Sequence, residues 1–298
     1  MRRIGFAVSG IRYYENDFYK NSRSSFASFS VTGTECQCRC AHCDAGLLRN
    51  MVCADTIEKF IFSVDKAAGS GCTGILVSGG CGPGGSVPLL PLIDGIGYAK
   101  KKGLIVLVHS GLLDQQTACA LKSANADMVL PDVIGSEKTI RSVYGIAKMP
   151  DDYFNSMLYC KNAGIETAPH IVIGLDFGKI EGEYNAIDMA CRLKAKNLVL
   201  VALVPKRGTK MEGISPPPLS EVTDVFRYAS EKLENCNISL GCSRPHIYSE
   251  ALEKAAVDLG FSAVAYPHEE TIRYAKELGL ETFFFEECCC LAGMHCGS

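Results

Sequence analysis

The stretch Ser30–Gly46, SVTGTECQCRCAHCDAG, follows an alternating, strand-like run and holds four of the chain's 16 cysteines. Three of these cysteines, Cys36, Cys40 and Cys43, form the spacing C-x3-C-x2-C. This spacing lets one loop place three thiolates around three irons of a cubane 4Fe-4S cluster and leave the fourth iron open. A zinc site is the alternative, because C-x2-C also occurs in zinc ribbons, and His42 or Cys38 would then supply the fourth ligand.

The run before the cysteines is the first of eight apolar, β-branched segments that end at glycine or proline. Helical patterns separate most of them, including residues 56–68, 89–102, 151–163, 181–194, 219–233 and 250–259. Strands that are apolar on both faces and alternate with helices are typical of a parallel sheet covered by helices. We therefore predict an α/β fold, a (β/α)8 barrel of the TIM type over residues 1–286, with a cysteine-rich tail over 287–298. The eight segments are FASFSVTG, GILVSGG, LIVLVHSG, MVLPDVIG, TAPHIVIGL, NLVLVALVP, ISLGCSRP and SAVAYP.

The amino-acid composition argues against several classes of function. The chain has 298 residues, 47% of them hydrophobic and 21% charged, and a formal net charge of -3. Without a basic excess there is no expectation of nucleic acid or of an anionic membrane surface as a partner. No apolar run approaches the length of a membrane span, and the first 20 residues do not read as a signal peptide, so we expect a cytoplasmic protein. In that compartment, many cysteines indicate metal or redox chemistry rather than disulfides.

The three-cysteine motif resembles that of the radical S-adenosylmethionine (SAM) superfamily, and other segments fit this resemblance. It implies a 4Fe-4S cluster whose open iron chelates the amino and carboxylate groups of SAM. Ser78, Gly79 and Gly80 in VSGGCGPGG resemble the glycine pair whose backbone meets the SAM amino group. Ile173 and Gly174 in HIVIGL resemble the apolar strand that packs against adenine. The segment LVPKRGTKM resembles the sixth-strand loop of the biotin synthase branch.

Several longer segments resemble one particular branch of this superfamily. SVTGTECQCRCAHC, VHSGLLD, DVIGSEKTIRSVYG, LGCSRPH and EECCCL are similar to the biotin-synthase-related radical SAM proteins that include subunits of the archaeal two-component lipoyl synthases. A paralogous radical SAM subunit is the partner that this resemblance implies. The chain departs from the pattern at Cys38, an extra thiol between the first two motif cysteines, which we interpret as a spectator beside the cluster.

Four polar residues are candidates for facing the cavity at the barrel mouth, where such folds hold their active sites, and one of them, His170, lies in the middle of a strand segment. His109 and His170 are candidates for substrate binding. Asp132 or Glu137 is a candidate for holding the ribose hydroxyls of SAM. Two of these residues have simpler readings, because Glu137 would also be a first-turn acid after the N-cap residue Ser136, and His170 would also be a core histidine.

The tail contains further cysteines, Cys288, Cys289, Cys290 and Cys296, which would hold an auxiliary iron-sulfur cluster with a donor from elsewhere in the chain. Cys81 and Cys242 are the candidate donors because both follow strand ends. Arg244 is a further candidate, by resemblance to the arginine ligand of biotin synthase. The alternative is a flexible, oxidisable tail with no metal or a labile zinc site. We interpret the remaining cysteines as small buried hydrophobic residues: Cys53, Cys72, Cys119, Cys160, Cys191 and Cys236.

Together these features predict a sulfur-inserting enzyme of the lipoyl synthase type. Its substrate would be an octanoyl group on a lysine of a lipoyl-carrier protein or peptide, its electron donor a ferredoxin or flavodoxin, and its sulfur source the auxiliary cluster. A radical SAM enzyme of the biotin synthase or hydrogenase-maturase type, acting on a free small molecule, is the first alternative. An iron-sulfur scaffold or electron-transfer protein is the second, although such a protein has no need of a SAM pocket.

Overall fold

The computed structural model describes residues 2–296, with the side chains of residues 2–295. All strand pairs are parallel, and they form two six-stranded sheets with the orders β3-β2-β4-β5-β6-β7 and β12-β1-β11-β10-β9-β8. The strands are β1 (Arg3–Ala7), β2 (Phe26–Ser30), β3 (Val52–Cys53), β4 (Gly74–Ser78), β5 (Ile105–Val108), β6 (Met128–Val129), β7 (Glu166–Thr167), β8 (His170–Ile173), β9 (Asn197–Ala202), β10 (Asn237–Leu240), β11 (Ala263–Ala265) and β12 (Glu281–Phe285).

The two sheets are continuous through one extended segment. β7 and β8 follow each other along residues 166–173, and a parallel bridge pairs Asp132, just after β6, with His170 of β8. The strands therefore form one curved parallel array, and each of the eight predicted segments contributes a strand to it. Within residues 2–296 no backbone pairing joins β2 to β12, so the array is barrel-like but open at this seam. β1 and β12, which we did not predict, extend the array beyond β11.

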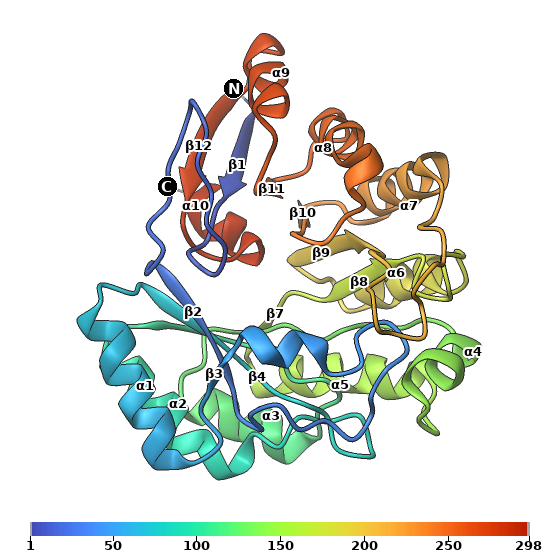
Figure 1. The fold of residues 1–298 in the computed structure, drawn as a ribbon. Coiled ribbons are helices and arrows are strands. Elements are labelled where there is room, and N and C mark those ends of the chain that lie inside the picture. Colours follow the sequence, from blue (N-terminus) through green and yellow to red (C-terminus); the bar gives the residue numbers. More distant parts are fainter. Residues whose placement is uncertain (1, 297–298) are drawn as a thin grey trace.

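Helices cover the outer face of this array (Figure 1). Local sequence sets several of their starts: the side chain of Thr56 accepts a hydrogen bond from the backbone N–H of Lys59, and Asp114 accepts one from Thr117. The main helices are α1 (Ile57–Gly69), α2 (Ile93–Lys101), α3 (Gln115–Ser123), α5 (Pro150–Ala163), α6 (Glu183–Arg192), α7 (Leu219–Lys232), α8 (Ser249–Asp258) and α9 (Glu269–Glu277), together with the short α4 (Glu137–Thr139).

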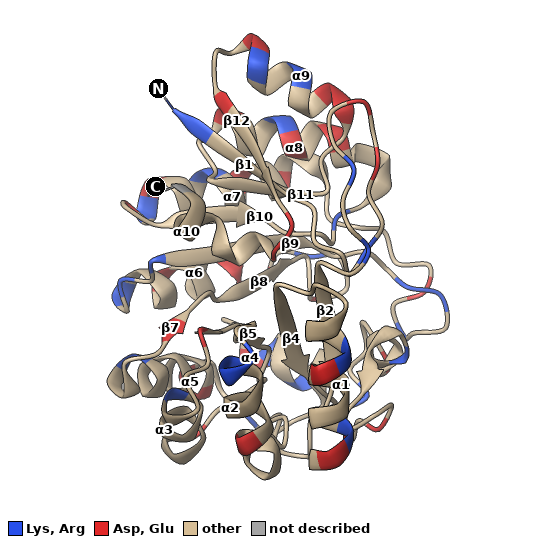
Figure 2. Ribbon diagram, turned by 90° about the vertical axis from the view of Figure 1, so that its left-hand side faces the viewer, with Lys and Arg blue, Asp and Glu red and all other residues tan. Residues whose placement is uncertain are grey.

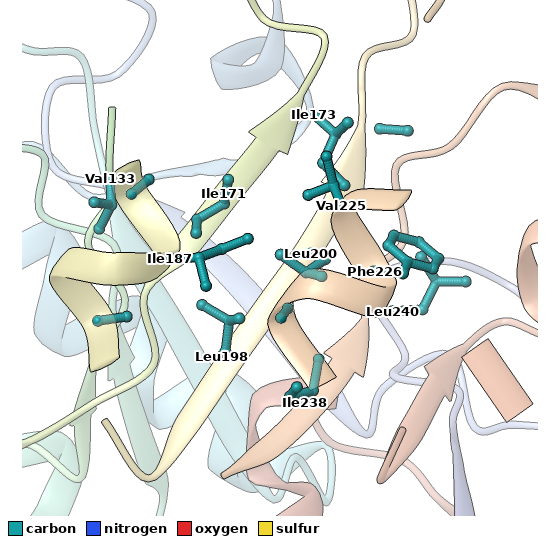
Figure 3. Packing of buried hydrophobic residues seen from close by; sticks show 14 of the residues in the cluster. Val133, Ile171, Ile173, Ile187, Leu198, Leu200, Val225, Phe226, Ile238 and Leu240 are labelled. Atoms are coloured by element: carbon teal, nitrogen blue, oxygen red, sulfur yellow. The ribbon is translucent and has the colours of Figure 1, made fainter. Parts of the chain in front are cut away.

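Successive side chains of a strand point to opposite faces of the sheet. One set packs against the helices in an outer core, and the other set packs in the interior of the strand array. Ile171 and Ile173 of β8 point outward and pack with Ile187 of α6 and Val225 of α7, beside Phe226 (Figure 3). The residues between them in the strand have the opposite direction because successive strand side chains alternate. His170 and Val172 therefore face the interior of the array.

The cysteine-rich tail is part of this interior. A turn of 3-10 helix, η5 (Cys289–Leu291), leads into α10 (Ala292–Cys296). η5 packs against β9, β10 and β11, and α10 lies beside β1 and the start of β10 (Figure 1). Cys290 and Leu291 are 2% and 1% exposed and pack with strand residues such as Leu107 and Val199. The hydroxyl of Ser239 donates a hydrogen bond of 2.9 Å to the carbonyl oxygen of Cys289. The described part of the tail is thus built into the core and is not a flexible extension.

Charged residues lie mainly on the helices and loops, where segments of both signs adjoin one another, as on α1 and α8 (Figure 2). Among the helices of residues 2–296, none combines the length and the hydropathy that a membrane-spanning segment needs.

Candidate active site

The cysteine loop after β2 is held by backbone hydrogen bonds to two neighbouring segments. Gln37 N–H donates to the carbonyl of Cys81 at 2.9 Å, and Ala41 N–H donates to the carbonyl of Val143 at 2.7 Å. A tight turn closes the loop, because Cys43 N–H donates to the carbonyl of Cys40 at 3.1 Å. These contacts place the loop over the carboxyl ends of β2 and β4, the edge where parallel α/β folds hold their sites.

The glycine pair Gly79–Gly80 at the end of β4 packs against the cysteine loop. Gly80 N–H donates to Thr32 Oγ1 at 2.7 Å, which ties the end of β4 to the turn after β2. A Cβ atom at Gly80 would lie 1.9 Å from the carbonyl oxygen of Glu35 and 2.6 Å from Cys36 Cα. Only glycine permits so close an approach of two backbones. Ser78, which precedes the pair, donates from its hydroxyl to the carbonyl oxygen of His109 at 3.0 Å and so joins β4 to β5.

The thiols of the loop form one group together with Cys81. Cys40 donates a hydrogen bond to Cys43, which lowers the pKa of Cys43 to about 4 and raises that of Cys40; His42 lowers the pKa of Cys43 further. Cys38 donates to the carbonyl oxygen of Gly82 at 3.1 Å, and burial raises its pKa. Because thiolates are the form that binds metal, a lowered pKa at Cys43 is compatible with a role as an iron-sulfur ligand. That Cys36, Cys40 and Cys43 hold the cluster stays a prediction.

The positions of the side chains do not settle the zinc alternative. Among side chains 2–295, no group of three or more Cys, His, Asp or Glu residues converges in the way that one metal ion requires. Zinc binds sulfur at about 2.3 Å, so three ligands would be drawn to within roughly 4 Å of one another. A cubane spaces its ligands over several irons and makes no such demand.

A second group of thiols combines the tail with the loop after β10. Hydrogen bonds from Cys289 and Cys290 lower the pKa of Cys288. Desolvation by the surrounding chain raises the pKa of Cys242, and the charge of Cys288 raises it further, although the residue itself is exposed to solvent. Cys242 thus interacts with the tail, whereas Cys81 interacts with the cysteines of the loop after β2. The side chain of Cys296 lies outside the described residues.

His109, Asp132 and His170 lie close to one another. His109 Nε2 is 3.7 Å from Asp132 Oδ1, and the two histidine rings have centroids 5.3 Å apart. The charge of Asp132 acts on Cys81, and the charge of Cys288 acts on His170. Burial lowers the pKa of His170, and His109 lowers it further. Three of the four predicted polar candidates are thus brought together.

The structure corrects the prediction for Arg244. Its guanidinium is buried and turned toward α8, where Nη2 lies 2.6 Å from Glu253 Oε1, Nε also donates to Ser249 Oγ, and Nη1 donates to the carbonyl of Gly241. A guanidinium held by a buried carboxylate is not presented to a cluster, so the analogy with the arginine ligand of biotin synthase fails here.

Three other candidates have structural roles. Ile173 is fully buried in the outer core, so its side chain does not face the interior. Gly174 makes a turn with φ +80°, donates its N–H to Glu183 Oε1 at 2.8 Å and abuts Pro217. Glu137 pairs with Arg141 at 2.6 Å one turn along, and Ser136 caps the helix, which agrees with the simpler reading of that acid.

Sequence reasoning missed two tyrosines of the site, Tyr144 and Tyr153. Burial raises the pKa of both hydroxyls, and the charges of Asp132 and Cys40 raise it further. The Tyr144 ring also lies beside His42, with centroids 5.6 Å apart. Tyr144 falls within the string DVIGSEKTIRSVYG but is not singled out there, and no quoted string includes Tyr153. The packing of the segment 140–153 against the cysteine loop brings both to the site.

Sequence comparisons do not identify the chain: no family model matches it, and no curated protein sequence matches it.

Solved structures with a similar fold were found. Methylornithine synthase PylB superimposes with a TM-score of 0.59 at 15% identity, over 92% of this chain and 84% of that chain. The FeFe-hydrogenase maturase HydG from Carboxydothermus hydrogenoformans has a TM-score of 0.59 at 15% identity, over 97% and 69%. TsrM from Kitasatospora setae, a radical S-adenosylmethionine methyltransferase, has a TM-score of 0.53 at 12% identity, over 97% and 66%. The fold of the chain is similar to the fold of these enzymes.

Proposed function

We propose that the chain is a radical SAM enzyme that binds a 4Fe-4S cluster through Cys36, Cys40 and Cys43. The observation that carries the proposal is the C-x3-C-x2-C loop seated on Gly80 at the carboxyl ends of β2 and β4. Its support from outside the chain is the fold, which is similar to that of TsrM, described as a radical SAM methyltransferase and solved with a SAM analogue. When bound, the cluster and SAM supply a 5′-deoxyadenosyl radical that abstracts hydrogen from an unactivated carbon.

The residues of this chain have distinct roles in that proposal. The loop thiolates would hold the cluster, while the interlocked backbones at Gly80 keep the loop in place. Asp132 accepts hydrogen bonds from ribose hydroxyls. His109 and His170 face the space where a substrate meets the radical, and the apolar strands around them exclude water, which would otherwise solvate and misplace the reacting groups.

The finer proposal is sulfur insertion into an octanoyl group carried by a lysine of a lipoyl-carrier protein or peptide. It is supported by the second thiol group, in which the charge of Cys288 acts on Cys242 and also on His170. An auxiliary iron-sulfur cluster at this place would be the sulfur source. We also propose that the enzyme receives electrons from a ferredoxin or flavodoxin and works with a paralogous radical SAM subunit.

A radical SAM reaction on a free small molecule is the second candidate. It is supported by the likeness of the fold to PylB, described as methylornithine synthase, and to HydG, described as a hydrogenase maturase. This candidate needs only the first cluster and no protein substrate.

SAM cleavage tests the common part of both candidates. Anaerobically reconstituted protein with dithionite should convert SAM to 5′-deoxyadenosine, detected by liquid chromatography and mass spectrometry. Replacing Cys36, Cys40 or Cys43 by Ala should abolish cleavage, while Cys38→Ala should retain most of it. Cys119→Ala is the matched control, because Cys119 on α3 is exposed. The prediction that Cys119 and Cys53 are buried was wrong, since both are exposed. Full activity in Cys36→Ala with loss in Cys38→Ala would show that the ligand assignment is wrong.

Product analysis separates the two candidates. An octanoyl-lysine peptide, assayed both with and without the paralogous subunit, should gain sulfur in at least one of the two reactions, with consumption of SAM. Cleavage of SAM with no change in the peptide under either condition would contradict sulfur insertion and favour a free small molecule.

A further inference from the structure

Asp176 joins the turn after β8 to the helical segment that follows β6. Its side chain is buried, and Oδ2 lies 2.9 Å from Lys138 Nζ of α4. The hydroxyl of Ser142 donates to Oδ1 at 3.2 Å. A single carboxylate thus contacts two successive parts of a neighbouring helical segment, one with each of its oxygens.

The second of these parts has an unusual backbone. Ser142 lies in a π-helical turn, η3 (Ile140–Tyr144), which continues directly from α4 and ends at Gly145 in the left-handed region with φ +68°. Single π-helical turns are rare and are frequent at functional sites. Through Ser142, the carboxylate of Asp176 ties this turn to the end of β8.

η3 in turn contacts the middle of the cysteine loop. The carbonyl of Val143 accepts a hydrogen bond of 2.7 Å from Ala41 N–H, and both side chains are buried in the same hydrophobic cluster. The Tyr144 ring lies beside the ring of His42, with centroids 5.6 Å apart. Ala41 and His42 are the two residues that separate the second predicted cluster ligand from the third. The contacts of η3 therefore act on the part of the loop that carries these two ligands.

The opposite side of the loop is held independently of Asp176. There the backbone of Cys36 abuts Gly80 so closely that no side chain fits between them. Loss of the Asp176 carboxylate would leave this side in place and would release the side that carries Cys40 and Cys43. Such a displacement would change the position of a bound cluster without removing any of its ligands.

We propose that Asp176 is a positioning residue for SAM cleavage: through Ser142 and η3, it sets the position of Cys40 and Cys43 at the carboxyl ends of the strands. The proposal rests on the radical SAM function and adds to it a residue that acts through the cysteine loop. A misplacement of reacting groups by about 1 Å can cost about a hundredfold in rate. Loss of the carboxylate should therefore lower the rate of SAM cleavage more than it lowers the binding of iron or of SAM.

Amide hydrogen exchange tests the link to the loop in the full-length protein, without reference to activity. Asp176→Ala removes both contacts of the carboxylate. Exchange followed by mass spectrometry should then become about tenfold faster in peptides that cover residues 36–46 and 137–146, because local opening of both segments becomes easier.

Asp127→Asn is the matched control for the loss of a partly buried carboxylate. Asp127 also joins a helix to the strand array, since its Oδ2 lies 2.6 Å from Lys100 Nζ of α2 and accepts the N–H of Val106 in β5 at 2.6 Å. It directly precedes β6 and so lies at the amino ends of the strands, away from the cysteine loop. This variant should leave the exchange of both peptides and the rate of SAM cleavage unchanged.

SAM cleavage separates positioning from a purely structural role. In Ser142→Ala and Asp176→Ala, bound iron and the KM for SAM should stay within about twofold of the parent values, while kcat should fall by about tenfold or more. Ser142→Thr keeps the hydroxyl that contacts Asp176 and should restore cleavage.

The contrary results are distinct. Equal exchange of the loop peptide in Asp176→Ala and in the parent protein would overturn the proposal. A fall in cleavage matched by an equal fall in bound iron would also overturn it, because Asp176 would then be needed to assemble the cluster and not to position it. A parent protein that binds iron but cleaves no SAM would contradict the radical SAM function, and with it a role in cleavage. Hydrogen exchange would still show in that case whether the carboxylate holds the loop.

Discussion

Arg244 Nη2 lies 2.6 Å from Glu253 Oε1, with the two side chains 5% and 0% exposed. The same carboxylate accepts hydrogen bonds from Thr271 Oγ1 and from the N–H of His268. Glu253 therefore joins the loop after β10 to α8 and to the start of α9. The loop that it anchors also carries Cys242, so a contact far from any substrate positions a cysteine of the proposed second cluster.

We expect Glu253→Gln to lower the free energy of unfolding by about 3–5 kcal/mol, because it leaves a buried guanidinium without a counter-charge. Urea denaturation monitored by circular dichroism measures this change. Glu166→Gln is the control: Glu166 pairs with Lys196 at 2.8 Å, but both side chains are at least half exposed, so its loss should cost less than about 1 kcal/mol. Equal effects of the two substitutions would contradict the role assigned to Glu253.

Because of the same carboxylate, the free energy of unfolding should depend on pH in the acid range. Burial raises the pKa of Glu253, but Arg244, Thr271 and His268 outweigh burial and hold it below the ordinary value of 4.5. A group whose pKa is lower in the folded protein stabilises the fold above its unfolded pKa, and this contribution is lost as the pH falls through the folded value. Between pH 7 and pH 5 its contribution should therefore be constant, and below about pH 4 it should decline. Glu253→Gln should show a flatter decline over that acid range in denaturation curves.

Gly80 should be intolerant of any side chain. A Cβ there would meet the backbone of Glu35 and Cys36, so Gly80→Ala should displace the cysteine loop and lower the iron bound by the reconstituted protein. Gly84→Ala is the matched control in the same segment, since a Cβ at Gly84 meets no atom within 4 Å. Iron analysis and SAM titration by calorimetry measure the two effects. Normal iron content in Gly80→Ala would show that the loop does not depend on this contact.

The tail should contribute to stability as well as chemistry. Leu291 is 1% exposed inside the strand array, so Leu291→Ala should lower the free energy of unfolding by about 2–5 kcal/mol through the cavity it leaves. Met294 is 60% exposed on the same segment, and Met294→Ala should change stability little. Thermal unfolding of both variants measures these two changes in stability. If Leu291→Ala were as stable as the parent, the tail would not be a part of the core in solution.

The burial of Leu291 changes how the tail cysteines should be studied. Deletion of residues after Glu287 would remove buried Cys289, Cys290 and Leu291 along with any ligands. Loss of iron in such a truncation would not distinguish a missing cluster from a disrupted core. Single substitutions at Cys288 and Cys242 avoid this ambiguity.

The eight strands and the cysteine loop were predictable from the sequence because their determinants are local. Apolar runs between glycines, polar caps such as Thr56 and Asp114, and the spacing of Cys36, Cys40 and Cys43 act within a few residues of the chain. Backbone propensity and ligand spacing of this kind do not depend on distant contacts. The fold class and the position of the first cysteine group therefore followed without a structure.

What only the tertiary structure decided is which distant residues meet. Whether Cys81 or Cys242 joins the tail, and whether Arg244 faces a cluster or Glu253, depends on the direction of side chains at strand ends that are far apart in sequence. The direction of Ile173 depends on the register of β8, where a shift of one residue exchanges the two faces. The placement of the tail inside the array depends on burial of Cys290 and Leu291 by strands from across the chain. Such long-range packing is the sum of many weak contacts, and no local pattern in the sequence encodes it.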